Sequence, residues 1–239
     1  MNLFKKKAPP PVAPIVVPPP PVEALKPAEP VKVIGLQDAG AFYDQIRISK
    51  LYGPVFSDTE FKGIEEIIKD CKAAKWPIAY VAYALATAYH ETAGTMQPIK
   101  EYGGRSYYMK MYDVTGKNPT RARQMGNTAE GDGALYCGRG YVQLTWKVNY
   151  ARASKELGVD LVGNPDLAMN PDIASDIMIK GMEQGWFTGK SLKSYLNDKP
   201  ATLEQFRECR RIINGTDKAT KIAEEAIEFQ KALTVGRWT

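Results

Sequence analysis

The feature that most constrains the fold is an apolar run over residues 78–91, which reads IAYVAYALATAYHE. Apolar residues recur three and four positions apart and most other positions are Ala or Tyr, so the run predicts a helix buried on nearly every side. Pro77 fits the first turn of such a helix, and Gly94 is expected to end it. The helix therefore belongs at the centre of a core. Its end presents one carboxylate, Glu91, with a second, Glu101, ten residues further on.

Other helical patterns surround this run. Ser57 and Glu60 form a capping-box pattern ahead of an apolar stripe, and Asn170 is a typical cap for a helix through residues 173–186. Further helices are predicted over residues 143–157, 202–213 and 218–233, with a short one at 121–125. The remainder of residues 94–140 is rich in Gly, Tyr and polar groups, which is typical of long loops. We expect a mainly α domain with a small β-hairpin or long loops in this region.

The N-terminal segment has a different composition. Residues 8–30 contain ten of the seventeen prolines, so we expect residues 1–34 to form a disordered, Lys- and Pro-rich arm and residues 35–239 to form the globular domain. The start, MNLFKKK, resembles the basic part of a signal peptide, but prolines interrupt the apolar stretch that must follow, so no cleaved signal is expected. No apolar run reaches eighteen residues, and we expect no transmembrane segment.

Charge and cysteine content narrow the function classes. The net charge is +5, and residues 1–34 supply three of these charges, so the domain has no concentrated basic face and a nucleic-acid partner is not expected. Three widely spaced cysteines argue against a disulfide framework and suit a reducing compartment. His90 is the single histidine and Gly94 replaces the second histidine of an H-E-x-x-H zinc motif, so no metal or other cofactor is expected.

The two glutamates suit glycosidic bond cleavage. That reaction needs a protonated carboxyl beside the leaving oxygen and an ionised carboxylate that activates water. Glu91 ends a buried helix, where desolvation and the helix dipole disfavour its charged form, whereas Glu101 lies in a wetter loop. The alternative is that Glu91 only closes a helix and Glu101 is a solvated loop charge, and the spacing alone favours this alternative because pairs of glutamates are common.

A third segment, residues 136–150 reading YCGRGYVQLTWKVNY, shifts this balance. HETAG at 90–94, GRGYVQLTWKVNY at 138–150 and NPDLA at 164–168 together resemble the glycoside hydrolase family 19 domain, known from plant chitinases and phage endolysins. The resemblance extends over roughly residues 50–235. It implies a two-lobed, lysozyme-like helical fold and an inverting mechanism on β-1,4-linked N-acetylated sugars.

The resemblance also implies roles for individual residues. The general acid falls on Glu91, the base on Glu101 and the water-positioning hydroxyl on Thr145. The spacing between the glutamates is shorter than in the plant enzymes, and Asp113 is the rival for the base. Arg139 lies between two glycines, and we expect it to tie the loops together by pairing with a carboxylate.

Substrate-binding roles are predicted for one set of residues, namely Gln143, Asn149, Asn214, Tyr141 and Trp146. The amides follow from the resemblance, and the two aromatic rings could stack on sugars. Thr145 and Asn149 are expected one turn apart on the same helix. The plant enzymes place an arginine in the last helix, where this chain has Glu224 and Glu225, so the contact that this arginine makes in the cleft is unaccounted for.

The function expected from these features is that of a phage-type endolysin, a monomer that cuts the glycan strands of bacterial peptidoglycan. Peptidoglycan is favoured over chitin because secreted chitinases carry export signals and disulfides. We expect the protein to remain in the host cytoplasm until lysis releases it to the cell wall. The alternatives are a chitinase that acts on N-acetylglucosamine polymers, a non-catalytic cell-wall or chitin-binding module and, with the least support, a Cys-His amidase that uses His90.

Overall fold

The computed structural model describes residues 33–49, 51–52 and 56–239. The predicted arm lies outside the described residues except for its last two positions. The first described residue, Val33, is buried in the core.

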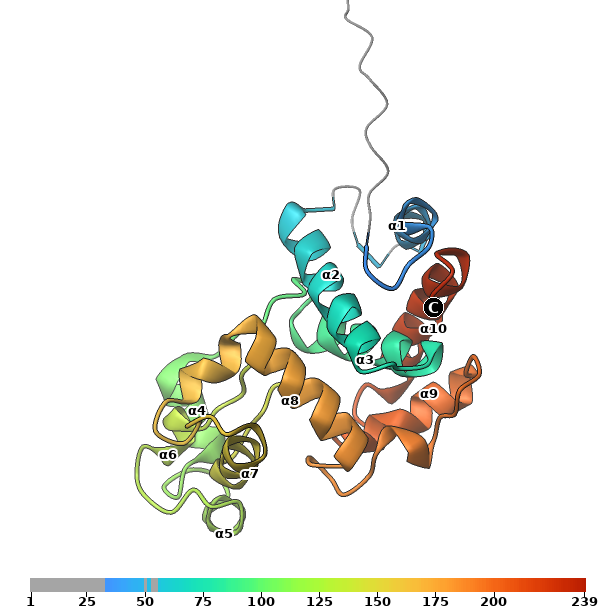
Figure 1. Cartoon of the computed structure of the whole chain (residues 1–239). Helices are drawn as coiled ribbons and strands as arrows, with labels where there is room; N and C mark the ends of the chain where they lie inside the picture. Colours follow the sequence, from blue (N-terminus) through green and yellow to red (C-terminus); the bar gives the residue numbers. More distant parts are fainter. Residues whose placement is uncertain (1–32, 50, 53–55) are drawn as a thin grey trace, which may run out of the picture.

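Helices make up nearly all of the regular structure (Figure 1). One group, which we call the large lobe, contains α1 (Ala39–Ile48), α2 (Asp58–Ala73), α3 (Ile78–Glu91), α9 (Leu203–Cys209) and α10 (Ala219–Val235). The small lobe contains α4 (Gly104–Tyr112), α5 (Pro119–Gln124), α6 (Asp132–Leu135) and α7 (Lys147–Leu157). Helix α8 (Pro171–Gln184) extends from one lobe to the other. Short 3-10 turns cover Pro165–Met169, Leu192–Ser194 and Arg210–Ile212.

Helix α3 is the centre of the large lobe, as its apolar sequence predicts. Its residues from Ala79 to Ala88 are buried apart from Tyr80, and it packs against α10 and α2. The helix ends at Glu91, where Gly94 takes a left-handed φ of 84° and donates its N–H to the carbonyl of Tyr89 at 2.7 Å. The predicted capping box of Ser57 is also present at the start of α2. The apolar pattern of α3 and the Gly94 turn therefore fix where the carboxylate of Glu91 lies.

One expectation about local structure was wrong, and two others differ from the structure only in detail. The helix predicted from residue 143 begins at Lys147, because Gln143 and Trp146 have φ values of 52° and 79°, which a right-handed helix cannot contain. The helix predicted over 202–213 is α-helical only to Cys209 and continues as a 3-10 turn. Of the two forms expected for residues 94–140, a hairpin or long loops, the structure has loops, which α4 and α6 interrupt and in which isolated bridges join Arg139 to Lys100 and Leu144.

The two ends of the described domain meet, because Leu36 pairs with Trp238 in an isolated bridge. The three cysteines are free and buried, and they lie in different places: Cys71 on α2, Cys137 before the Arg139 turn and Cys209 at the end of α9. Burial raises the pKa of all three thiols. Within the described ranges, no helix is both long enough and apolar enough to cross a membrane.

Candidate active site

A cleft of about 680 Å³ lies between the lobes. Its lining from the large-lobe side and the end of α8 includes Glu91, Phe187, Thr188, Ile213 and Asn214. Its lining from the small-lobe side includes Glu101, Tyr112, Arg121, Gln143, Thr145, Trp146 and Asn149. The structure therefore brings together every residue that the sequence assigned to catalysis and all but one of those assigned to substrate binding.

Glu91 is held by an arginine that sequence reasoning missed. Its Oε1 accepts a hydrogen bond from Nη1 of Arg210 at 2.6 Å, and the guanidinium, 3% exposed, also donates to the carbonyl of Asp217. The cation thus comes from the turn after α9. The last helix instead supplies Glu225, whose Oε2 lies 3.4 Å from Nδ1 of His90. The signal that could have revealed Arg210 is its place four residues before Asn214 in the CRRIING segment.

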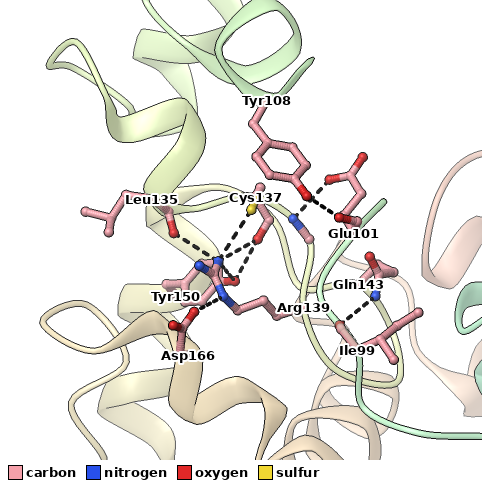
Figure 2. A network of polar contacts seen from close by, with 10 residues as sticks. Ile99, Glu101, Tyr108, Leu135, Cys137, Arg139, Gln143, Tyr150 and Asp166 are labelled. Carbon is pink, nitrogen blue, oxygen red and sulfur yellow. Dashed lines mark hydrogen bonds and ion pairs between the residues drawn. The ribbon is translucent and has the colours of Figure 1, made fainter. Parts of the chain in front are cut away.

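Glu101 is held by neutral donors. Its Oε1 accepts a hydrogen bond from the Tyr112 hydroxyl at 2.6 Å, and its Oε2 accepts one from the N–H of Gly138 at 3.1 Å. The backbone of Glu101 pairs with the same turn, because its N–H donates to the carbonyl of Gly138 at 2.9 Å. The Tyr108 hydroxyl donates to the carbonyl of Glu101 (Figure 2). The carboxylate is therefore fixed by α4 on one side and the glycine turn on the other.

Arg139 holds the glycine turn in place from inside the protein (Figure 2). Its side chain is 2% exposed, and its Nε donates to Asp166 at 2.8 Å, which confirms the predicted pairing with a carboxylate. Its Nη1 donates to the carbonyls of Leu135 and Cys137 and to the hydroxyl of Tyr150. A buried guanidinium is tolerated only when such partners surround it. Arg139 therefore positions Glu101 indirectly, through the backbone of the turn.

Thr145 and two amides line the small-lobe side near Glu101. The Thr145 hydroxyl donates to the carbonyl of Gln143 at 2.8 Å, which leaves its oxygen lone pairs as acceptors toward the cleft. The amide group of Gln143 donates to the carbonyls of Ile99 and Gly140, so only its oxygen remains for a ligand. Asn149 donates one N–H to the carbonyl of Thr145 at 2.8 Å, so its second N–H and its oxygen both remain for a ligand.

Two residues considered from the sequence lie elsewhere. Tyr141 is 1% exposed and belongs to the core, so the structure does not place it among the residues that line the cleft. Asp113 is also 1% exposed, and it accepts hydrogen bonds from the N–H groups of Gly131, Gly133 and Thr115 and from the Thr115 hydroxyl. Burial raises the pKa of Asp113, but these hydrogen bonds outweigh burial and hold it below its usual value. Asp113 therefore stabilises the small lobe.

The residues around the cleft offer little to a metal ion. Within the described ranges, no three His, Cys, Asp or Glu side chains gather in a way that could hold one. Glu91 and Glu101 each have donors as their direct partners. The arrangement instead suits proton transfer, with two carboxylates and a hydroxyl around one cleft.

The sequence profile of glycoside hydrolase family 19, described as chitinase class I, matches residues 58–199. The chain belongs to this family. The matched range includes both glutamates of the cleft and the whole segment from Gly138 to Asn149.

Individual family 19 relatives match shorter segments. A basic endochitinase of Vitis vinifera is 34% identical over 109 residues, which cover 45% of this chain and 32% of the relative. Endochitinase 1 of Theobroma cacao is 42% identical over 67 residues, covering 28% and 20%. The chain thus spans about a third or less of the length of these curated relatives.

A solved structure extends the likeness to most of the fold. Chitinase C from Streptomyces griseus superposes with a TM-score of 0.54 at 22% identity, covering 84% of this chain and 78% of that one. This likeness confirms the expected mainly α, lysozyme-like fold of the family 19 domain.

Proposed function

We propose that the chain is an endolysin that hydrolyses β-1,4 glycosidic bonds in bacterial peptidoglycan by an inverting mechanism, with Glu91 as general acid and Glu101 as general base. The observation that carries this proposal is the convergence of Glu91, Glu101 and Thr145 in one cleft between the lobes. Family membership supports the glycosidic chemistry, and the choice of polymer rests on separate observations.

In the proposed reaction each group takes a part that its contacts support. One proton of the attacking water goes to Glu101, and the other is held by the Thr145 oxygen, whose own proton is committed to the carbonyl of Gln143. A lone pair of the water then faces the sugar carbon, and the bond to the leaving oxygen breaks as Glu91 protonates that oxygen. Glu101 ends protonated and Glu91 ionised, and exchange with solvent restores the starting state.

Arg210 adds two features to this scheme. Because it occupies Oε1 of Glu91, the transferred proton is carried on Oε2. When the proton leaves, the guanidinium stabilises the carboxylate that forms, since an opposite charge nearby favours the charged form. The ion pair therefore strengthens as the leaving group departs.

Two observations favour peptidoglycan. Arg121 lines the cleft with an exposed side chain that makes no ion pair with any described residue, and a free cation there suits a glycan that carries lactyl carboxylates. The buried free thiols suit a chain that folds in a reducing compartment, which agrees with a protein held in the host cytoplasm until lysis. A chitinase is the second candidate, because the relatives named above are endochitinases.

A binding module without catalysis also has specific support. A segment of 55 residues is 42% identical to a Hevea brasiliensis protein named inactive chitinase-like protein 1, over 23% of this chain. Retention of Glu91, Glu101 and Thr145 in one cleft argues against this alternative.

The test compares glutamate variants on two polymers. Glu91→Gln and Glu101→Gln should each lower the release of reducing ends from purified peptidoglycan at least about 100-fold, the usual contribution of a general acid or base. Glu156→Gln, an exposed change on α7, is the matched control and should keep full activity. Unchanged melting temperatures would show that the variants are folded.

The products separate the alternatives. Mass analysis of the fragments identifies the bond that is cut, and NMR of the first product identifies its anomeric form, which inversion predicts to be α. Lysis by Glu91→Gln at the wild-type rate would reject the acid assignment. Cleavage of chitin oligomers alone would favour the chitinase, and binding of peptidoglycan without turnover would favour the module.

A further inference from the structure

We propose that Tyr112 is a positioning residue for Glu101: its hydroxyl fixes the orientation of the carboxylate and stabilises the charge on it through a hydrogen bond. The inference rests on the proposed function, since it assigns Glu101 the role of base. It starts from the hydrogen bond of 2.6 Å between the Tyr112 hydroxyl and Oε1 of Glu101. Among the described residues, no other side chain donates to this carboxylate.

The phenol of Tyr112 is held firmly. Tyr112 is the last residue of α4, and its carbonyl accepts a hydrogen bond from Nδ2 of Asn127 at 2.9 Å. Oδ1 of the same amide accepts from the N–H of Lys147 at 3.1 Å, at the first residue of α7. The Tyr112 ring also packs edge to face against Trp146, with centroids 5.1 Å apart. The donor is therefore anchored to the helix that carries Asn149.

The direction of this hydrogen bond follows from charge. Burial, and then the hydrogen bond and negative charge of Glu101, raise the pKa of Tyr112 well above its usual value, so the phenol stays protonated and donates. Together with the N–H of Gly138 it gives the carboxylate one donor on each oxygen. Each oxygen keeps a lone pair for the reacting water. Donors of this kind favour the ionised form, the one a general base must have before water attacks.

Other titratable groups surround this pair. Tyr107 and Tyr108 lie on α4, Cys137 and Arg139 lie in the glycine turn, and Lys100 precedes Glu101. Tyr108 donates to the backbone carbonyl of Glu101 and not to its carboxylate. Replacement of Tyr112 by Phe removes one hydroxyl and leaves all of these groups in place. Any shift in the titration of Glu101 can therefore be assigned to the lost donor.

The experiment compares Tyr112→Phe with Tyr195→Phe, which makes the same change on another partly buried tyrosine, outside the cleft. A hydrogen bond to a charged group is worth roughly 10- to 100-fold, so kcat/KM of Tyr112→Phe should fall by about this factor, mostly through kcat. The acid limb of its pH profile should move up by about 1 pH unit. Tyr195→Phe should match the wild type in both respects.

A second measurement does not depend on activity. In protein labelled with 13C at the glutamate carboxyls, the signal of Glu101 should titrate at higher pH in Tyr112→Phe than in the wild type. An unmoved Glu101 signal together with an unmoved acid limb would overturn the proposal, and so would a loss of activity explained entirely by a lower melting temperature. Failure of the proposed function is seen separately, as full activity of Glu91→Gln or Glu101→Gln.

Discussion

Glu91 and Glu101 line the same cleft but are supported in opposite ways. Glu91 ends a helix packed in the core of the large lobe and is paired with a single buried cation, Arg210. Glu101 lies in a loop of the small lobe, where a phenol and a backbone N–H hold it without adding charge. The support of Glu91 thus depends on one side chain, and the support of Glu101 depends on the path of a loop. Substitutions of the residues that support Glu91 and of those that support Glu101 should therefore differ in their effects on stability and activity.

The largest loss of stability is expected from substitution of Arg139, which supports Glu101 through the glycine turn. Arg139→Met leaves the carbonyls and hydroxyl that this guanidinium binds without their donor in a buried site, and should lower the free energy of unfolding by about 4 kcal/mol. Asp166→Asn removes only the outer partner, 63% exposed, and should cost less than about 1 kcal/mol. Urea unfolding measures both. Equal losses would mean that the exposed ion pair, and not the backbone contacts, holds the turn.

A slightly smaller loss of stability is expected from substitution of Arg210, the partner of Glu91. Arg210→Met breaks a buried pair and should cost about 3 kcal/mol, together with most of the activity, because Glu91 loses its partner. Arg211→Met is the matched control, since its neighbouring guanidinium is 47% exposed and pairs with Glu208 on the surface. That control should change stability by less than about 1 kcal/mol. Full activity of Arg210→Met would contradict a role for the cation at the acid.

A change at Gly138 tests the loop without altering charge. An added Cβ would lie 2.6 Å from Oε1 of Gln143 and 3.2 Å from Oε2 of Glu101, so Gly138→Ala should cost about 1 to 2 kcal/mol and lower activity more than tenfold. In Gly40→Ala the new carbon meets no atom closer than 3.5 Å, so stability should hold or rise. Thermal melts and initial rates measure the pair. If both variants kept wild-type rates, the glycine turn would not position the base.

The smallest effect concerns Asp113, which stabilises the loops of the small lobe without facing the cleft. Its folded-state pKa is lowered, so its contribution to stability is fully present above the unfolded value of about 4 and is lost as pH falls through the lower folded value. Asp113→Asn should therefore be less stable than the wild type at pH 7. Urea unfolding at several pH values should show this gap narrowing below about pH 4. A gap that stays constant would mean that charge at Asp113 contributes nothing.

The sequence predicted the parts of the fold that depend on local patterns. The periodicity of α3, the capping box of Ser57 and the cap at Asn170 are each encoded within a few residues. The first of these places Glu91 at the end of its helix. The supports of the two carboxylates could not be predicted in the same way. Arg210 and Tyr112 act through contacts that only the folded chain creates, and apart from its position four residues before Asn214 nothing in the sequence distinguishes Arg210 from Arg211.

The left-handed φ values in the loop before α7 could not be predicted from the sequence either. Gln143 and Trp146 are not residues that favour positive φ, so the apolar pattern alone suggested that the helix began earlier. The candidate site residues were predicted because the GRG and QLTW motifs resemble a family. Their geometry depends on Arg139, whose burial only the assembled loops create.

The three buried thiols allow the local opening of the two lobes to be compared by experiment. A thiol-specific reagent reaches Cys71 or Cys209 only when part of the large lobe opens, and it reaches Cys137 only when the loop behind Glu101 opens. Labelling at equilibrium would thus give separate opening free energies for the two regions. The labelling of these thiols would therefore show which side of the cleft opens more readily.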